Sequence, residues 1–182
     1  MRRRLLAWTT LAVTAALVAG CAARMRVNAY MPAGMDLGQY RTYGWAPADE
    51  LPTGDPRLDS NRFFSERVRA AVELELAPRG LVKVASGSPD LLVHYHARVE
   101  QAIESADLDR DYGRCATTDC RPYVYAAGTL LIDLIDPRTK SVVWRGWAEG
   151  SLAGAVEDQA WLEQTVDETV ARILARFPAR RP

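Results

Sequence analysis

A run of alternating side chains from Asp90 to Glu100 constrains the fold more than any other feature of this sequence. Every second position of the run is apolar or aromatic, and most of the positions between them are polar. Successive side chains of a β-strand point to opposite faces, so the pattern predicts a strand with one buried face and one wet face. The residues of the buried face are Leu91, Val93, Tyr95, Ala97 and Val99. Such a strand needs neighbouring strands and a second layer that covers its apolar side.

Two helices are predicted to form that second layer. From about residue 60 to residue 77 apolar residues recur at four-residue steps, and Asp59 or Ser60 can cap the start of this helix. Pro78 and Gly80 end it. A second apolar stripe runs through the C-terminal segment and stops at Pro178. Its members are Leu162, Val166, Val170, Ile173, Leu174 and Phe177.

Further strands are predicted at residues 26–31, 40–46, 81–84, 124–135 and 142–149, which are rich in β-branched and aromatic residues. Residues 136–140 contain Pro137 at the second position of a turn, so the last two strands form a hairpin. The order is strands, helix, strands, helix. It predicts an α+β fold, a two-layer sandwich in which a mainly antiparallel sheet is covered on one face by two helices.

Residues 1–20 have the features of a cleaved secretory signal. The arginines Arg2 to Arg4 precede an apolar stretch from Leu5 to Gly20, whose 16 residues are fewer than the roughly 20 that a membrane-spanning helix needs. Small residues end the stretch just before Cys21, a pattern that resembles the lipobox of bacterial lipoproteins. We therefore expect residues 1–20 to be a lipoprotein signal peptide, residues 21–25 a lipidated tether, and residues 26–182 a single domain.

The resemblance to a lipobox implies that Cys21 is the first residue of the mature chain. It implies a thioether-linked diacylglycerol on this residue and an amide-linked acyl chain such as palmitate on its amino group, and several acyl chains anchor a protein almost permanently. Asp at the next position is the usual inner-membrane retention signal of such lipoproteins, and this chain has Ala22 instead. The expected location is the cell envelope, on the outer membrane and facing the periplasm.

The charge balance gives no indication of a nucleic-acid partner. The sequence has 23 basic and 23 acidic residues, and loss of the arginines near the N-terminus leaves the mature chain slightly acidic. Nucleic-acid-binding domains usually carry a basic patch or stripe, which is not apparent here. We expect no nucleic-acid partner and no cofactor.

Two cysteines remain once Cys21 is assigned to lipid, and both lie in one short segment. Cys115 and Cys120 would meet in an oxidising compartment and could close a small disulfide loop. Alternatively they could bind a metal together with His94 and His96, the two histidines of the chain, or stay as free thiols. The compartment favours the disulfide, and we expect no metal.

Motifs of known catalytic centres are not recognisable in the sequence. Ser151 lies one position too early for the glycine-flanked serine of a nucleophile elbow. Asp133 and Asp136 are three residues apart on a strand and its turn, so they are predicted to be a polar strand residue and a turn cap rather than an acid–base pair. We expect that the protein is not an enzyme. The alternative is a small periplasmic hydrolase or metal-binding protein that uses His94 and His96, which share one face of a strand.

Aromatic residues suggest where a partner could bind. Trp144 and Trp147 are three apart on a predicted strand and must face opposite sides of the sheet. The long irregular segment between the strands that end near residue 100 and begin near residue 124 carries aromatic side chains, and long insertions are often functional. The candidate partner surface consists of Tyr112, Tyr123 and Tyr125.

An ordered set of short motifs resembles the lipoprotein family known as domain of unknown function 4136. The motifs are Tyr40 to Trp45, Arg79 to Leu81, Pro89 to Val93, Gly128 to Asp133 with Asp136, Trp144 to Gly146, and Phe177 with Pro178. They span Val27 to Pro178. The resemblance implies a lipid-anchored, periplasm-facing α/β domain without an established activity. The function expected is a binding, structural or assembly module of the outer membrane. It is attached through the lipid on Cys21, and the candidate partners are an envelope protein or an envelope ligand.

Overall fold

The computed structural model describes residues 25–47, 52–59, 61–85, 87–104, 123–152 and 155–178. The predicted lipid site Cys21, the pair Cys115 and Cys120, and Tyr112 lie outside these ranges. Among the described residues, no helix is long and apolar enough to cross a membrane.

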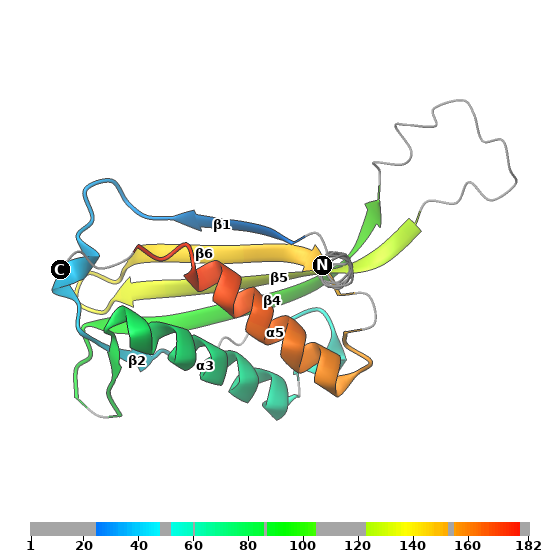
Figure 1. The fold of residues 1–182 in the computed structure, drawn as a ribbon, viewed down its shortest axis with the longest axis horizontal. Helices are drawn as coiled ribbons and strands as arrows, with labels where there is room; N and C mark the ends of the chain where they lie inside the picture. The colour runs from blue at the N-terminus through cyan, green and yellow to red at the C-terminus, as the bar shows by residue number, and fades with distance from the viewer. Residues whose placement is uncertain are drawn as a thin grey trace, which may run out of the picture.

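A six-stranded open sheet forms the centre of the fold, in the order β1-β6-β5-β4-β2-β3 (Figure 1). Four strands make antiparallel pairs with their neighbours: β1 (Arg26–Tyr30), β6 (Ser141–Ser151), β5 (Tyr123–Asp136) and β4 (Leu91–Glu104). The short strands β2 (Thr42–Trp45) and β3 (Val82–Lys83) extend the sheet in parallel. The sheet is therefore mixed, and the prediction of a mainly antiparallel sheet describes only one part of it.

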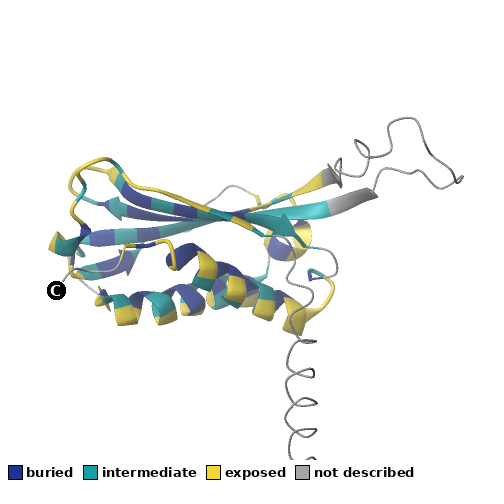
Figure 2. Cartoon of the chain, turned by 45° about the horizontal axis from the view of Figure 1, so that its top comes forward, coloured by how far each residue is buried: buried dark blue, intermediate teal, exposed yellow. Residues whose placement is uncertain are grey.

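Two long helices, α3 (Arg62–Leu76) and α5 (Gln159–Leu174), lie side by side on one face of the sheet (Figures 1 and 2). A third, short helix, α2 (Pro56–Asp59), and two 3₁₀ turns, η1 (Leu37–Gln39) and η2 (Ala77–Arg79), were not predicted. The predicted cap of α3 was wrong: Asn61 is the N-cap, and its side chain accepts a hydrogen bond from the Phe64 amide. Asp59 instead belongs to α2, which ends just before α3 begins. The predicted α+β fold is confirmed.

The core lies between the helices and the sheet, and both predicted apolar stripes point into it. Val68, Val72 and Leu76 of α3 and Val170 and Ile173 of α5 are fully buried. On the sheet side, the predicted buried face of β4 is confirmed at its first positions, with Leu91 and Val93 fully buried.

The two tryptophans of β6 face opposite sides, as predicted. Trp144 is 1% exposed and packs edge to face against Phe177, with ring centroids 5.4 Å apart. The Trp144 ring also lies over Gly146, where a side chain would overlap the ring and come within 2.6 Å of Ile173 Cγ2. Trp147 pairs with Leu131 of β5 on the other face of the sheet.

Strands β4 and β5 are longer than the sequence pattern predicts. The alternation fades after residue 100, but β4 continues to Glu104, which pairs with Tyr123 at the start of β5. Strand β6 reaches only Ser151, opposite Ala127. The last residues of β4 and the first of β5 therefore form a two-stranded ribbon that projects from the sheet (Figure 1).

Candidate functional site

An apolar pocket of about 550 Å³, counted with its open mouth, lies between the helices and the sheet. It is near the end of the sheet from which the β4–β5 ribbon projects. The sheet contributes Ala97 and Val99 of β4, Gly128 and Leu130 of β5, and Ala148 and Gly150 of β6. The helical layer contributes Leu58 of α2, Phe64 of α3, and Leu162, Thr165, Val166 and Thr169 of α5.

Small residues in two neighbouring cross-strand rows make room for this pocket. In one row Ala97 pairs with Leu130, which pairs with Ala148. In the next, Val99 pairs with Gly128, which pairs with Gly150. At the other end of the sheet the equivalent row consists of Val93, Leu134 and Trp144, whose large side chains fill the space under the helices.

The pocket wall presents few polar groups. The hydroxyl of Thr169 donates a hydrogen bond to the Thr165 carbonyl oxygen at 2.6 Å, so the helix itself satisfies this group. Of the described residues that line the pocket, Arg98 alone has an ionisable side chain. That side chain is 67% exposed and its Nε lies 3.7 Å from a carboxylate oxygen of Glu100. Such a pocket can hold an apolar group, but its wall offers no acid–base pair.

The start of the described chain borders the pocket. Met25, one residue before β1, is among the lining residues. A Cβ at Gly150 would lie 3.7 Å from Met25 atoms, an ordinary contact, and the atoms of a longer side chain beyond it would enter the pocket that Gly150 lines. At Gly128 a Cβ would come within 2.6 Å of Leu152 Cδ1, because the Leu152 side chain lies over that glycine.

His94 and His96, the predicted alternative site, lie apart from the pocket. Both are on β4 at the positions that alternate with its buried face, which places them on the sheet face away from the helices. His94 pairs with Asp133 of β5, and His96 pairs with Leu131. In the part of the chain that the structure describes, no three His, Cys, Asp or Glu side chains are grouped so that they could hold a metal ion.

Asp133 forms an ion pair on the same outer face. Its side chain is 7% exposed, and Arg145 of β6 donates to it from Nε and from Nη2, each at 2.7 Å. Hydrogen bonding to Asp133 raises the pKa of the Arg145 guanidinium. This carboxylate is therefore engaged with Arg145, its cross-strand neighbour.

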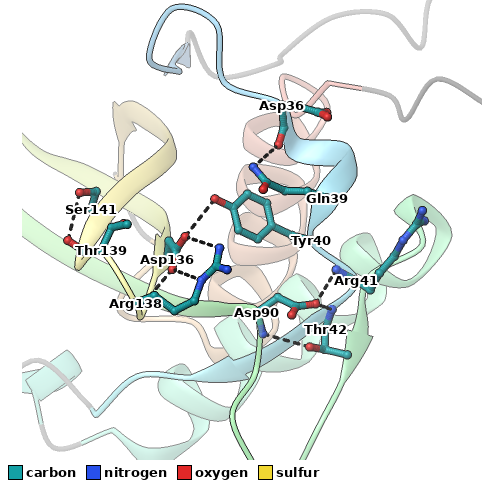
Figure 3. Close-up of polar contacts among 10 residues, drawn as sticks. All are labelled: Asp36, Gln39, Tyr40, Arg41, Thr42, Asp90, Asp136, Arg138, Thr139 and Ser141. Carbon is teal, nitrogen blue, oxygen red and sulfur yellow. Dashed lines mark hydrogen bonds and ion pairs between the residues drawn. The ribbon is translucent and has the colours of Figure 1, made fainter.

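Asp136 caps the β5–β6 turn at the opposite end of the sheet, as predicted (Figure 3). Its carboxylate accepts hydrogen bonds from the Arg138 amide at 2.8 Å, from the Arg138 guanidinium, and from the Tyr40 hydroxyl at 3.3 Å. The Arg138 side chain is the main cause that lowers the pKa of Asp136 to about 2. Tyr40 follows η1, so the carboxylate ties the turn to a distant segment.

Asp90 makes a similar connection beside Asp136 (Figure 3). Its Oδ2 accepts the amides of Arg41 and Thr42 at 2.8 and 2.9 Å, and the Thr42 hydroxyl accepts the Asp90 amide at 3.0 Å. These backbone contacts lower the pKa of Asp90. The carboxylates of Asp90 and Asp136 hold the strand ends together. The motif residues in this region, Tyr40 to Trp45, Pro89 to Val93 and Asp136, therefore have a structural role.

The predicted partner surface is described only in part. Tyr123 and Tyr125 lie in β5, on the projecting ribbon, and pair with Glu104 and Ala102 of β4. The pocket, by contrast, was missed from the sequence. Its signal was available in the small residues Ala97, Gly128, Ala148 and Gly150, but their meaning depends on a cross-strand register that the sequence does not state.

Solved structures are similar to this chain at low sequence identity. A PDZ domain protein from Parabacteroides distasonis has a TM-score of 0.55 at 16% identity, covering 87% of this chain, which spans 37% of that protein. A DUF4136 family protein from Bacteroides thetaiotaomicron has a TM-score of 0.49 at 13% identity, covering 81% of this chain and 94% of its own. A PelC dodecamer from Paraburkholderia phytofirmans has a TM-score of 0.49 at 13% identity, covering 86% and 99%.

No curated protein matches the chain. At 16% identity, the likeness to the PDZ domain protein concerns the fold alone. The family is shown by the sequence match itself: residues 27–179 match the family Domain of unknown function (DUF4136). The chain belongs to the DUF4136 family.

Proposed function

We propose that this protein is a lipid-anchored module of the cell envelope, and that its domain binds an apolar group in the pocket between helices and sheet. The observation that carries the proposal is the wall of that pocket, which consists mainly of apolar side chains and glycines. Small-molecule sites are typically lined by apolar side chains with only a few polar groups, and this wall has that character.

Binding is favoured over catalysis because no pair of titratable groups converges on the pocket wall among the described residues. A general acid or base must reach the reacting atom within hydrogen-bond distance. The alternative, a hydrolase or metal-binding protein, depends on His94 and His96 on the other sheet face. Its support is weaker, since the acid opposite His94 is Asp133, which Arg145 already holds.

A hydrophobic fluorescent dye tests the pocket directly. The protein without its signal and lipid, residues 22–182, should bind the dye, and Gly150→Leu should weaken binding because the added side chain fills the pocket from a position where a Cβ is accommodated. Glu149→Leu is the matched control, since the neighbouring position faces the other side of the sheet. Equal loss in both variants, or no loss in either, would place the dye elsewhere.

The lipid anchor is a separate part of the proposal and rests on the lipobox-like sequence around Cys21. The mature protein then carries acyl chains on this residue and faces the periplasm from the outer membrane. Cys21→Ser should release the protein from membranes or leave a longer, unprocessed precursor. A variant that partitions and migrates like the wild type would remove the anchor from this account.

The segment with Cys115, Cys120 and the candidate tyrosines is proposed as a partner surface stiffened by a disulfide. Thiol counting under denaturing conditions should find neither of these two cysteines free. Changing Tyr112, Tyr123 and Tyr125 to serine should abolish capture of an envelope partner from solubilised membranes, whereas glutamine at both histidines should not. Loss of capture in the histidine variant alone would favour the metal or hydrolase alternative.

A further inference from the structure

The pocket lies within a short reach of the proposed lipid site. Met25 borders the pocket, and Cys21 is four residues earlier in the chain. Four extended residues span at most about 14 Å. An acyl chain has a length of about 15 Å, half the roughly 30 Å hydrocarbon core of a bilayer. A chain attached at Cys21 can therefore reach the pocket from many positions of the tether.

We propose that one of the acyl chains carried by Cys21 inserts into this pocket. The inference rests on the proposed function and names both the ligand class and its source. The chemistry agrees, because the wall is built from residues such as Leu130, Leu162 and Val166. An acyl chain is apolar along its length and needs no hydrogen-bond partner, and the pocket wall provides few such partners.

Attachment favours this acyl chain over chains of other lipids. A group on a short flexible tether has an effective concentration in the millimolar range, without any new contact. The chain would exchange the hydrocarbon of the membrane for the apolar wall of the pocket, so little transfer free energy opposes the move. The tether then keeps this acyl chain beside the pocket.

Charge does not select a different ligand at this end of the sheet. The exposed guanidinium of Arg26 lies 3.6 Å from Glu149, and Arg98 lies 3.7 Å from Glu100. These side chains lie on the outer face of the sheet, so neither arginine offers the pocket a cation for an anionic headgroup. The remaining acyl chains on Cys21 stay in the bilayer, so the domain stays anchored with its pocket end close to the membrane.

Photocrosslinking in isolated envelopes tests this proposal on the full acylated protein. Cells that express it are fed a palmitic acid analogue with a diazirine near the end of the chain. After irradiation, mass spectrometry should find the Cys21 lipopeptide joined to a peptide of the pocket wall, such as one containing Leu162 or Val166. Gly150→Leu should lower the yield of this product about ten-fold, because the added side chain competes for the space. Glu149→Leu should leave it unchanged.

The possible contrary results are distinguishable. Phospholipid adducts on the pocket wall without the lipopeptide product would show that the pocket takes an acyl chain from the bilayer, which overturns this inference and leaves the proposed binding function standing. A lipopeptide joined only to membrane lipid would overturn it as well. Absence of any acylated Cys21 would overturn the anchor and this inference together, whereas dye binding by residues 22–182 without the lipid would still test the pocket.

Discussion

Gly146 of β6 should not tolerate even a methyl group. A Cβ at this position would overlap the ring of Trp144 and lie 2.6 Å from Ile173 Cγ2. Both neighbours are fully buried, and the Trp144 ring is fixed against Phe177. The added atom therefore has no direction in which the core can yield easily.

The net cost of Gly146→Ala follows from two opposing effects. Overpacking a filled core costs about 1–3 kcal/mol. Replacing glycine inside a strand recovers roughly 0.5–1 kcal/mol, because glycine loses more backbone freedom on folding. The expected loss is at most about 2.5 kcal/mol, which corresponds to a fall in thermal midpoint of up to roughly 10 °C for a domain of this size.

Gly150→Ala is the matched control, four residues later on the same strand and facing the same side. Its Cβ would meet Met25 at 3.7 Å, so the backbone gain should appear without a clash. Thermal and urea unfolding of both variants measure the difference. Ile173→Ala should lessen the penalty of Gly146→Ala in a double-mutant cycle. Equal stability of the two alanine variants would refute the packing described around Trp144.

Two further predictions concern the buried carboxylates. The folded-state pKa of Asp136 is about 2 against an ordinary value of 3.8, so its contribution to stability is present above pH 3.8 and is lost as the pH falls towards 2. Asp136→Asn should remove this part of the acid sensitivity, measured by urea unfolding at a series of pH values; an unchanged pH profile would contradict the prediction. Arg145→Ala should cost about 1–2 kcal/mol, less than a fully buried pair because the arginine side chain is 41% exposed, and adding Asp133→Asn should recover most of the loss in the same unfolding assay.

Local patterns of the sequence predicted the buried faces of single elements. The alternation through β4 and the stripes of α3 and α5 identify their buried faces, because each depends only on the period of one element. The parallel pairing of β2 with β4 could not be obtained in this way. It joins Tyr43 to Leu91, and α3 lies between them in the chain. Pairing of this kind depends on how the helix returns the chain to the sheet.

The candidate site was likewise predictable from the sequence only in part. The turn-capping role of Asp136 was predictable, since Asp in a turn commonly accepts a nearby amide. The pocket was not, because it depends on the alignment of Ala97, Gly128 and Gly150 from three strands under α5. A small residue in one strand does not indicate a pocket. Only the cross-strand register places several small residues side by side.

The location of a bound acyl chain is the most direct measure of the central claim. Residues 22–182, which lack the lipidated cysteine and carry labelled methyl groups, would be titrated with palmitate and followed by NMR. Chemical-shift changes are expected at Met25, Leu162 and Val166, which line the pocket, and none at Leu134, which lies under the other end of the helices. Changes centred on Leu131, on the outer face of the sheet, with the pocket methyls unaffected, would contradict it.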